Sequence, residues 1–219
     1  MHLIITGADG ALGSAVVARH VEAGDRVAAL HGAAPADPSS GRFAAGDLAD
    51  EANARDVMAQ AARWLGTVDA LIHLVGGFQW ATTATTTLAD WRAMFDANIA
   101  TAVASVNAAL PYFSDGGAIV LIGAVSAQPA KAGFGPYGAA KAGVARLTEA
   151  LAAELAPRGI RVNAALPSII DTPRNRADMP DVDPASWTTP AAVADTIAFL
   201  ASPAARGVTG ALLPVTNPA

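Results

Sequence analysis

Short apolar runs alternate along the chain with longer stretches in which apolar residues recur at helical spacing. Nearly continuous apolar runs are typical of strands that are buried on both faces of a sheet. Strands are therefore predicted at 3–6, 26–30, 69–75, 118–123, 160–166 and 211–215, with a further short strand near Phe43. Helices are predicted between them at 11–23, 49–65, 88–113, 136–156 and 190–201.

This alternation predicts the fold class. Strand–helix–strand units join by right-handed crossovers into a doubly wound α/β sheet of parallel strands, Rossmann-like, with helices on both faces. We expect one domain over residues 1–219. A polar loop at 31–41 takes the place of a short helix. A second irregular segment, at 171–190, is longer than an ordinary connection and predicts a lid or substrate loop at about 168–190.

Composition narrows the possible functions. The hydrophobic share is 53% and the charged share 15%, which indicates a densely packed protein or one that buries more surface in an oligomer. The net charge of −5 without a basic run argues against nucleic acid as a partner. The chain has no cysteine, which excludes disulfides and thiolate chemistry. His2, His20 and His73 lack metal-ligand spacing, so no metal is expected.

No signal peptide is recognisable at the N-terminus, and no uninterrupted apolar run has the length of a membrane span. The expected location is therefore cytoplasmic, with no membrane partner.

The first predicted turn is rich in glycine. In "TGADGALG", residues 6–13, Gly7 allows a tight turn, Gly10 lets the backbone approach a pyrophosphate, and Gly13 lets helix and strand pack closely. The helix that begins here offers unpaired N–H groups to phosphates. An ordinary strand-to-helix turn is the alternative. The nucleotide hypothesis takes the whole loop as cofactor-binding, including Asp9, Ala11 and Leu12.

Tyr137 and Lys141 are four residues apart and share one face of a predicted helix. An ammonium group beside a phenol favours the phenolate, so we expect Lys141 to lower the pKa of Tyr137. Tyr137 would then donate a proton to the product, while Lys141 also holds the ribose of a nicotinamide cofactor. A helical pair without function is the alternative for these two residues taken alone.

Taken together, these features resemble the short-chain dehydrogenase/reductase family, and the resemblance covers nearly the whole chain. It implies NAD or NADP as cofactor and a small-molecule substrate. It also implies that Asn98, in "FDANIA", supports a water-linked proton path to Lys141. Further cofactor contacts implied by the family's motifs are Asp47 and Leu48 in "GDL", Val75, Gly76 and Gly77 in "HLVGG", and Pro167 and Thr172 in "LPSIIDT", where Ser168 replaces a glycine.

One catalytic position departs from the family. Most members have a serine thirteen residues before the tyrosine, where this chain has Ala124. Ser126 lies two residues further on, which keeps the face of a strand but moves about 6–7 Å along it. Ser126 is therefore an imperfect substitute, although curvature of the loop could bring it back.

A closer resemblance accounts for this alanine. "GAVSAQPAKAGFGPYGAAKAGV" and "DTPRNRADMP" followed by "SWTTP" resemble quinonoid dihydropteridine reductase, a branch with alanine at this position. A quinonoid dihydropterin takes hydride into a conjugated imine, so one proton donor can suffice where a ketone needs a second hydrogen bond. Trp80 and Trp187, with Phe78 and Met179, could stack on a flat ring, or could simply pack the core or lid. Asn98 departs from the branch, which lacks this asparagine.

The choice of nucleotide stays open from sequence. An acidic residue ending the second strand would favour NAD, and the branch has an aspartate there. This chain has His31, which could bind a ribose or a phosphate, and no arginine replaces it. Asp9 would repel a 2′-phosphate if it reached that side.

Three hypotheses follow. The first is an NAD(P)H-dependent reductase of the dihydropteridine reductase type. The second is a short-chain dehydrogenase/reductase that acts on a ketone or alcohol, with Ser126 or water in place of the serine. The third is a nucleotide-binding protein without turnover. The alanine-rich helices at 88–113 and 136–156 could pair across a two-fold axis, and the family implies a homodimer or homotetramer.

Overall fold

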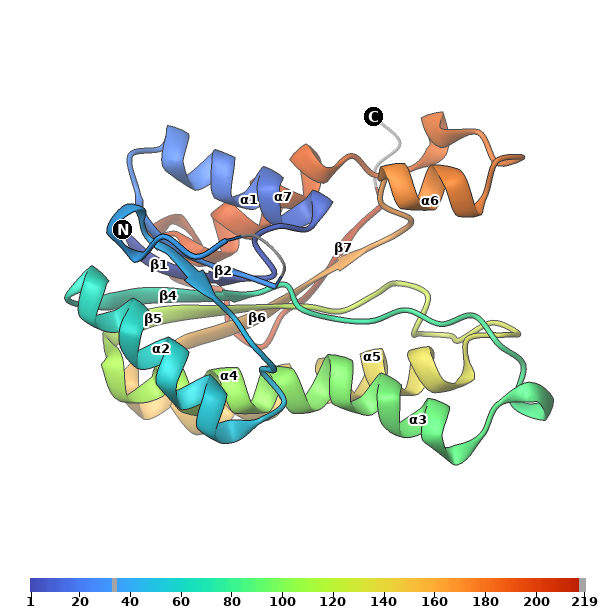
Figure 1. Ribbon diagram of the computed structural model, residues 1–219, viewed down its shortest axis with the longest axis horizontal. Helices are drawn as coiled ribbons and strands as arrows, with labels where there is room; N and C mark the ends of the chain where they lie inside the picture. Colours follow the sequence, from blue (N-terminus) through green and yellow to red (C-terminus); the bar gives the residue numbers. More distant parts are fainter. Residues whose placement is uncertain (33–34, 217–219) are drawn as a thin grey trace.

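The computed structural model describes residues 1–32 and 35–216. Seven parallel strands form one sheet in the order β3-β2-β1-β4-β5-β6-β7, as Figure 1 shows. The doubly wound parallel sheet predicted from sequence is confirmed. The strands are β1 (His2–Thr6), β2 (Arg26–His31), β3 (Arg42–Ala44), β4 (Val68–His73), β5 (Phe113–Ile122), β6 (Arg161–Pro167) and β7 (Leu212–Val215).

Helices cover both faces of the sheet. In Figure 1, α1 (Ala11–Glu22) and α7 (Pro190–Ala201) lie above it, and α2 (Glu51–Leu65), α4 (Thr101–Ala109) and α5 (Gly135–Leu155) lie below. Each face has its own buried cluster, because successive side chains of a strand point to opposite faces. In β1, for example, Leu3 and Ile5 pack with α7, whereas Ile4 packs with α2.

Several helices begin at capping residues. The Asp50 side chain accepts from the N–H groups of Ala52 and Asn53 at the start of α2. Thr87 and Asp90 form a capping box at the start of α3 (Leu88–Phe95). Such caps satisfy N–H groups that have no partner within the helix, and they help to fix where these two helices start.

Several elements differ from the sequence prediction. The strand expected at 118–123 begins at Phe113, because Gly116 and Gly117 interrupt the apolar run without ending the strand. The helix expected at 88–113 is continuous but contains a π turn, Asp96–Ala100, and ends in a 3-10 turn at Tyr112. The lid segment is not wholly irregular.

The lid contains the short helix α6 (Pro173–Asp178), which the side chain of Thr172 caps by accepting from the N–H of Asn175. The polar loop expected at 31–41 starts later than predicted, because His31 still belongs to β2. This loop contains a 3-10 turn, Pro38–Ser40, and residues 33–34 lie outside the described part of the chain.

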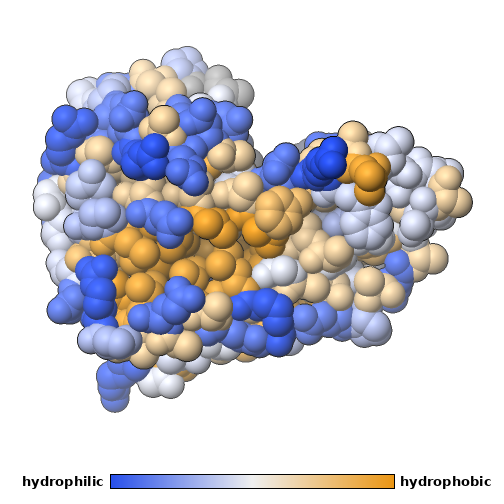
Figure 2. All heavy atoms as spheres, turned by 90° about the horizontal axis from the view of Figure 1, so that it is seen from below, coloured by the Kyte–Doolittle hydropathy of each residue, from blue (hydrophilic) through white to orange (hydrophobic). Residues whose placement is uncertain are grey.

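The continuous helix from Leu88 to Tyr112 has the length and composition of a membrane span, and 44% of its most apolar window is buried inside the fold. Core helices of soluble proteins share these properties, so the feature does not identify a span, and the absence of one stays a prediction. Part of the helix is nevertheless exposed, at Phe95 and Val103. Figure 2 shows an extensive apolar surface on this side of the molecule, where α4 and α5 lie.

Candidate active site

All strands run parallel, so β1, β4, β5 and β6 end at the same edge of the sheet. The strand order reverses between β1 and β4, because consecutive crossovers go first to one side of β1 and then to the other. A crevice opens at such a point, and open α/β sheets bind their ligands there. The chemical groups expected from sequence lie along this edge.

The glycine loop joins β1 to α1. Gly7 has a φ of 67°, a left-handed conformation that favours glycine. A β-carbon on Gly13 would overlap the carbonyl oxygen of Gly7, so this position also needs glycine. No side chain caps α1, whose N-cap is Gly10. The first helical N–H groups, from Ala11 and Leu12 onward, therefore suit a pyrophosphate.

Gly76 follows β4 and brings two polar side chains together. A β-carbon on Gly76 would lie 2.8 Å from Oδ1 of Asn98 and 3.1 Å from Nζ of Lys141. Both side chains are buried, although they come from different helices. A β-carbon at position 76 would crowd both groups, so glycine leaves room for Asn98 Oδ1 and Lys141 Nζ on this side of the crevice.

The Asn98 side chain is held by the backbone around it. Its Nδ2 donates to the carbonyl oxygens of Gly77 (3.1 Å) and Met94 (2.9 Å), and its Oδ1 accepts from the N–H of Gly77 (3.3 Å). Both N–H donors are thereby used, while Oδ1 retains a second lone pair on the side of Gly76. Asn98 lies within the π turn, an irregularity that often marks functional sites.

The Lys141 Nζ donates to the carbonyl oxygen of Ile122, at the end of β5, over 2.9 Å. An ammonium group has three donors, so two more N–H bonds can serve a ribose or a water molecule. Burial lowers the pKa of Lys141 to about 8. At neutral pH the group is still mostly charged.

Tyr137 lies one helical turn before Lys141, as predicted, but its pKa moves in the opposite direction from the one expected. Burial raises the pKa of Tyr137 to about 12. The Tyr137 ring packs among aromatic side chains, and Nζ of Lys141 donates to the carbonyl oxygen of Ile122. In this structure Tyr137 is thus a neutral phenol, able to donate a proton.

Ala124 occupies the buried turn after β5. Its methyl group offers no hydrogen bond where most of the family would offer a hydroxyl. Ser126 lies in the following turn and is half-buried, and the described part of the chain records no hydrogen bond for its hydroxyl. The structure therefore does not fix the Ser126 side chain toward Tyr137.

Aromatic side chains border the tyrosine. The Phe78 ring meets Tyr137 edge-on, with centroids 4.9 Å apart, and Phe134 lies 6.1 Å from Tyr137 and 5.9 Å from Phe78. Trp80 packs across Gly133, where a β-carbon would overlap its indole nitrogen. Phe78 and Trp80 are 56% and 61% exposed. The place of Phe134 beside Tyr137 was not predicted, because no local pattern in the sequence relates Phe134 to Phe78.

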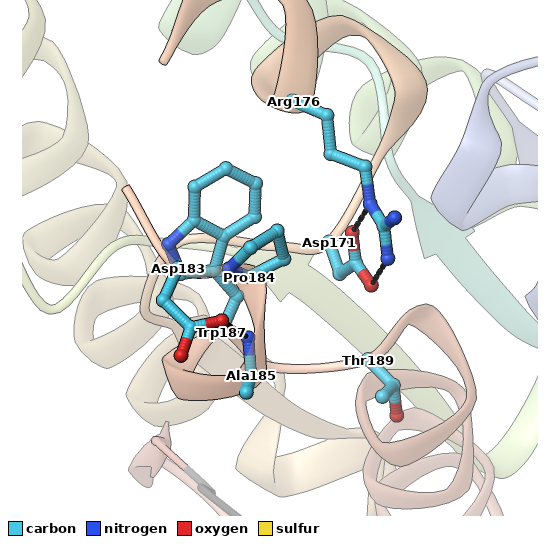
Figure 3. A pocket seen from close by; sticks show the side chains of 7 residues that line it. All are labelled: Asp171, Arg176, Asp183, Pro184, Ala185, Trp187 and Thr189. Carbon is cyan, nitrogen blue, oxygen red and sulfur yellow. Dashed lines mark hydrogen bonds and ion pairs between the residues drawn. The ribbon is translucent and has the colours of Figure 1, made fainter. Parts of the chain in front are cut away.

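Trp187 differs from Trp80, because its side chain is only 4% exposed. It lines a cavity of about 430 Å³ in the lid, shown in Figure 3, together with Asp171, Arg176 and neighbouring residues. The Arg176 guanidinium binds both carboxylate oxygens of Asp171, at 2.6 and 2.7 Å. A direct stacking role for Trp187, expected from sequence, would require the lid to rearrange.

His73 ends β4 and lies within a directional chain of hydrogen bonds. The N–H of Leu74 donates to Oγ1 of Thr6 (3.2 Å), which is 3.0 Å from Nδ1 of His73. On the other side, Nε2 is 3.3 Å from Oγ1 of Thr101, whose hydroxyl donates to Ala97 (2.9 Å). All partners are satisfied if Nε2 carries the proton. Burial, and secondly the charge of Lys141, lowers the pKa of His73 to about 3, so it stays neutral.

The remaining candidates line the same edge. Oδ1 of Asp47 accepts from the N–H of Ala49, and Leu48 is buried in the core. Asn53 fixes this loop by donating to the carbonyl of Asp47. Val75 and Gly77 flank Gly76 after β4, Pro167 ends β6, and Thr172 caps α6; His31 ends β2 beside Asp9 of the glycine loop.

Comparison with known proteins now decides the family. A family model described as enoyl-(acyl carrier protein) reductase matches residues 10–217. The chain is 30% identical to 2-(R)-hydroxypropyl-CoM dehydrogenase of Xanthobacter autotrophicus, over 96% of this chain and 94% of the relative. The chain belongs to the short-chain dehydrogenase/reductase family.

Other family members agree. Cis-4-hydroxycyclohexanecarboxylate dehydrogenase of Sinomonas cyclohexanicum is 36% identical, over 77% of this chain and 72% of the relative. A short-chain dehydrogenase/reductase from Serratia marcescens superposes with a TM-score of 0.88 at 27% identity, over 97% of this chain and 95% of that one. Carveol dehydrogenase from Mycobacterium avium, solved in complex with NAD, gives a TM-score of 0.86 at 25% identity, with the same coverage.

Family membership makes this short-chain dehydrogenase/reductase an oxidoreductase that uses NAD(P), and it sets aside the hypothesis of a nucleotide-binding protein without turnover. The glycine loop, the uncapped start of α1 and the convergence of Asn98 and Lys141 at Gly76 all fit that cofactor. The resemblance to the dihydropteridine reductase branch stays a prediction.

Proposed function

We propose that this protein reduces a flat, conjugated imine of the quinonoid dihydropterin type with NAD(P)H. The observation that carries the proposal is Ala124, a buried methyl group where most of the family has a hydroxyl. Hydride addition to a ketone builds negative charge on one oxygen, which a second hydrogen bond would stabilise. Addition to a conjugated imine spreads that charge over ring nitrogens, so a single proton donor suffices.

The state of Tyr137 supports the direction of reduction. The phenol is protonated at neutral pH, as a proton donor must be, although burial raises its pKa and makes it a weaker acid than a free tyrosine. When bound, the reduced nicotinamide supplies the hydride. Lys141 holds its charge within the crevice, where it orients hydroxyl groups and favours departure of the proton from Tyr137. Asn98, fixed by Gly77 and Met94, presents Oδ1 for a water molecule on that path.

The aromatic border supports a flat substrate. Phe78 and Trp80 expose much of their surface beside Tyr137 and the loop that precedes α5. Flat heteroaromatic rings gain from offset or edge-on contacts with such side chains. A small aliphatic ketone would leave most of this surface uncovered.

The direct test measures oxidation of NADH and of NADPH with quinonoid dihydropterin, generated in the assay, and with a panel of ketones. We expect turnover with the pterin and at least tenfold lower kcat/KM with every ketone. Ala124→Ser should raise ketone reduction by about tenfold or more, since one donor to an oxyanion contributes at least that much. Efficient ketone turnover by the unaltered protein would contradict the proposal.

A second candidate is a dehydrogenase of hydroxyl-bearing substrates. It is favoured by Asn98, which the pterin-reducing branch lacks, and by two relatives that are named as dehydrogenases of hydroxy compounds. In this case Ser126 or water would take the serine's place. Oxidation of a panel of alcohols with NAD(P)⁺ distinguishes the two candidates, because only the second predicts efficient turnover. Ser126→Ala then tests Ser126 within the second candidate: it should abolish that oxidation if Ser126 replaces the serine and leave it unchanged if water does.

We also propose that a second copy covers the face formed by α4 and α5. Val103 of α4 is exposed there and Leu147 of α5 is only partly buried, while exposed Phe95 of α3 and partly buried Ile99 of the π turn precede α4 in the same continuous helix. Figure 2 shows a large apolar patch on this side of the molecule, with hydrophilic side chains at its edges and within it. A β-carbon on Gly143 of α5 would lie 2.8 Å from Cδ1 of Ile99, so the glycine lets the Ile99 side chain pack closely against α5.

A further inference from the structure

The second strand of the sheet ends without an acidic residue, yet a carboxylate reaches that point from elsewhere. Oδ1 of Asp9, in the glycine loop, accepts from the N–H of Gly32, the residue after β2, over 3.3 Å. Its other oxygen lies 3.8 Å from where a β-carbon on Gly32 would be. The Asp9 side chain is exposed to the crevice edge. The glycine loop and the end of β2 are therefore linked through this carboxylate.

His31, the last residue of β2, lies next to the carboxylate. Both of its ring nitrogens are buried and have no hydrogen-bond partner among the described residues. Burial and the charge of Arg42 lower the pKa of His31, and Asp9 acts in the opposite direction without reversing the shift. His31 is therefore neutral at pH 7. It offers a polar contact at this point without adding positive charge.

We propose that Asp9 and His31 together bind the adenosine ribose as a diol and make the protein selective for NAD(H) over NADP(H). In dinucleotide-binding folds an acidic residue at the end of the second strand accepts from the ribose 2′-hydroxyl. Here the glycine loop supplies that carboxylate instead. A 2′-phosphate carries about two negative charges, so the Asp9 carboxylate would repel it. The neutral His31 ring supplies no positive charge to offset this repulsion.

Arg42 is the group that would have to bind a 2′-phosphate if this inference were wrong. It pairs with Ala29, two residues before His31, so its side chain lies on the same face of the sheet as His31. Its place in the strand is further from the glycine loop than that of His31, which pairs with Ala44. The Arg42 backbone is therefore further from the glycine loop than His31, although its charge acts on His31, and we expect Asp9 rather than Arg42 to decide which nucleotide binds.

The test is equilibrium binding of NADH and NADPH by calorimetry, without substrate, so it does not depend on the proposed function. The unaltered protein should bind NADH at least tenfold more tightly than NADPH. Asp9→Asn keeps the shape of the side chain, and it should improve NADPH binding about tenfold while weakening NADH binding several-fold. Tighter binding of NADPH by the unaltered protein would overturn the inference.

Arg42→Ala is the matched control, and it should leave both dissociation constants within about twofold. A selective loss of NADPH binding in Arg42→Ala would assign the phosphate to Arg42 and count against Asp9. Equal weakening of both nucleotides by Asp9→Asn would also overturn the inference, because it would show that Asp9 shapes the loop rather than discriminating charge. His31→Asp places an acid on β2 itself, and it should preserve or increase the preference for NADH.

Discussion

At Tyr137, burial sets the direction of the pKa shift. The side chain shares a helix face with Lys141, yet burial raises its pKa to about 12, and Nζ of Lys141 donates to the carbonyl oxygen of Ile122. The phenol is therefore protonated at neutral pH. When the cofactor binds, its hydroxyl groups would surround Lys141. The ammonium group of Lys141 and the phenol of Tyr137 would then interact more strongly.

Tyr137→Phe should lower kcat by about 10²- to 10⁴-fold, the range typical of a lost general acid. Its ring remains available to Phe78, so the dissociation constant for the nucleotide should change less than threefold. Stopped-flow turnover and calorimetry measure the two quantities separately. Retention of more than a tenth of the activity would mean that another group donates the proton.

The buried Lys141 should cost stability. Its folded pKa of about 8 lies below the unfolded value, so the native state disfavours the charge, and the cost is fully present below pH 8. A depression of this size corresponds to about 3 kcal/mol. Lys141→Met should raise the free energy of unfolding at pH 7 by about 1–2 kcal/mol, after allowing for the lost hydrogen bond to Ile122.

The gain from Lys141→Met should shrink as the pH rises from 8 past 10.5, because lysine then becomes neutral in the unfolded chain as well. Urea unfolding at pH 7 and pH 10.5 measures the difference. An equal gain at both pH values would show that packing, rather than charge, is the cause.

At the scale of elements, hydrogen bonds through His73 join β1, β4 and the π turn. Thr6 precedes the glycine loop, and Thr101 follows the turn that carries Asn98. The His73 side chain thus connects, through hydrogen bonds, the proposed phosphate-binding end of the crevice and its proposed catalytic end. The sequence showed a histidine without metal spacing, and the structure gives it a positioning role.

His73→Phe should destabilise the protein by about 2–4 kcal/mol at pH 7, because two buried hydroxyls lose their partner. The folded pKa of His73 lies below its unfolded value, so the unaltered protein loses stability as pH falls from 6.5 toward 3. The variant lacks that loss, and the gap between the two should narrow by about 2 kcal/mol between pH 7 and pH 5. A constant gap would contradict the neutral, buried histidine.

At the scale of the whole molecule, the helix from Leu88 to Tyr112 contributes residues both to the crevice and to the outer surface. One side carries Asn98 into the crevice, and the other leaves Phe95 and Val103 exposed. A second copy over α4 and α5 would cover the exposed part and would also account for the high hydrophobic share of the chain.

Val103→Glu should shift the protein toward monomer in analytical ultracentrifugation, because it buries a charge without a partner in the proposed interface. Val21→Glu is the matched control, since Val21 is equally apolar and more exposed but lies on α1, on the opposite face of the sheet. If both variants sediment like the unaltered protein, the interface lies elsewhere.

The sequence by itself determined the family, the parallel sheet and most element boundaries. These features follow from local signals, namely apolar runs, their helical or strand periodicity, and the glycines at 7 and 13. It also located Tyr137 and Lys141, because their spacing on one helix is a local property. It did not anticipate the π turn or α6, where the backbone departs from the regular periodicity that a sequence pattern shows.

Only the tertiary structure decided how these groups behave. The pKa of Tyr137 depends on Phe78 and Phe134, and the burial of Trp187 depends on how the lid folds. The reach of Asp9 to the end of β2 brings together residues 23 positions apart. Such contacts join segments that are distant in sequence, and burial and charge act through distance in space, so no local pattern encodes them.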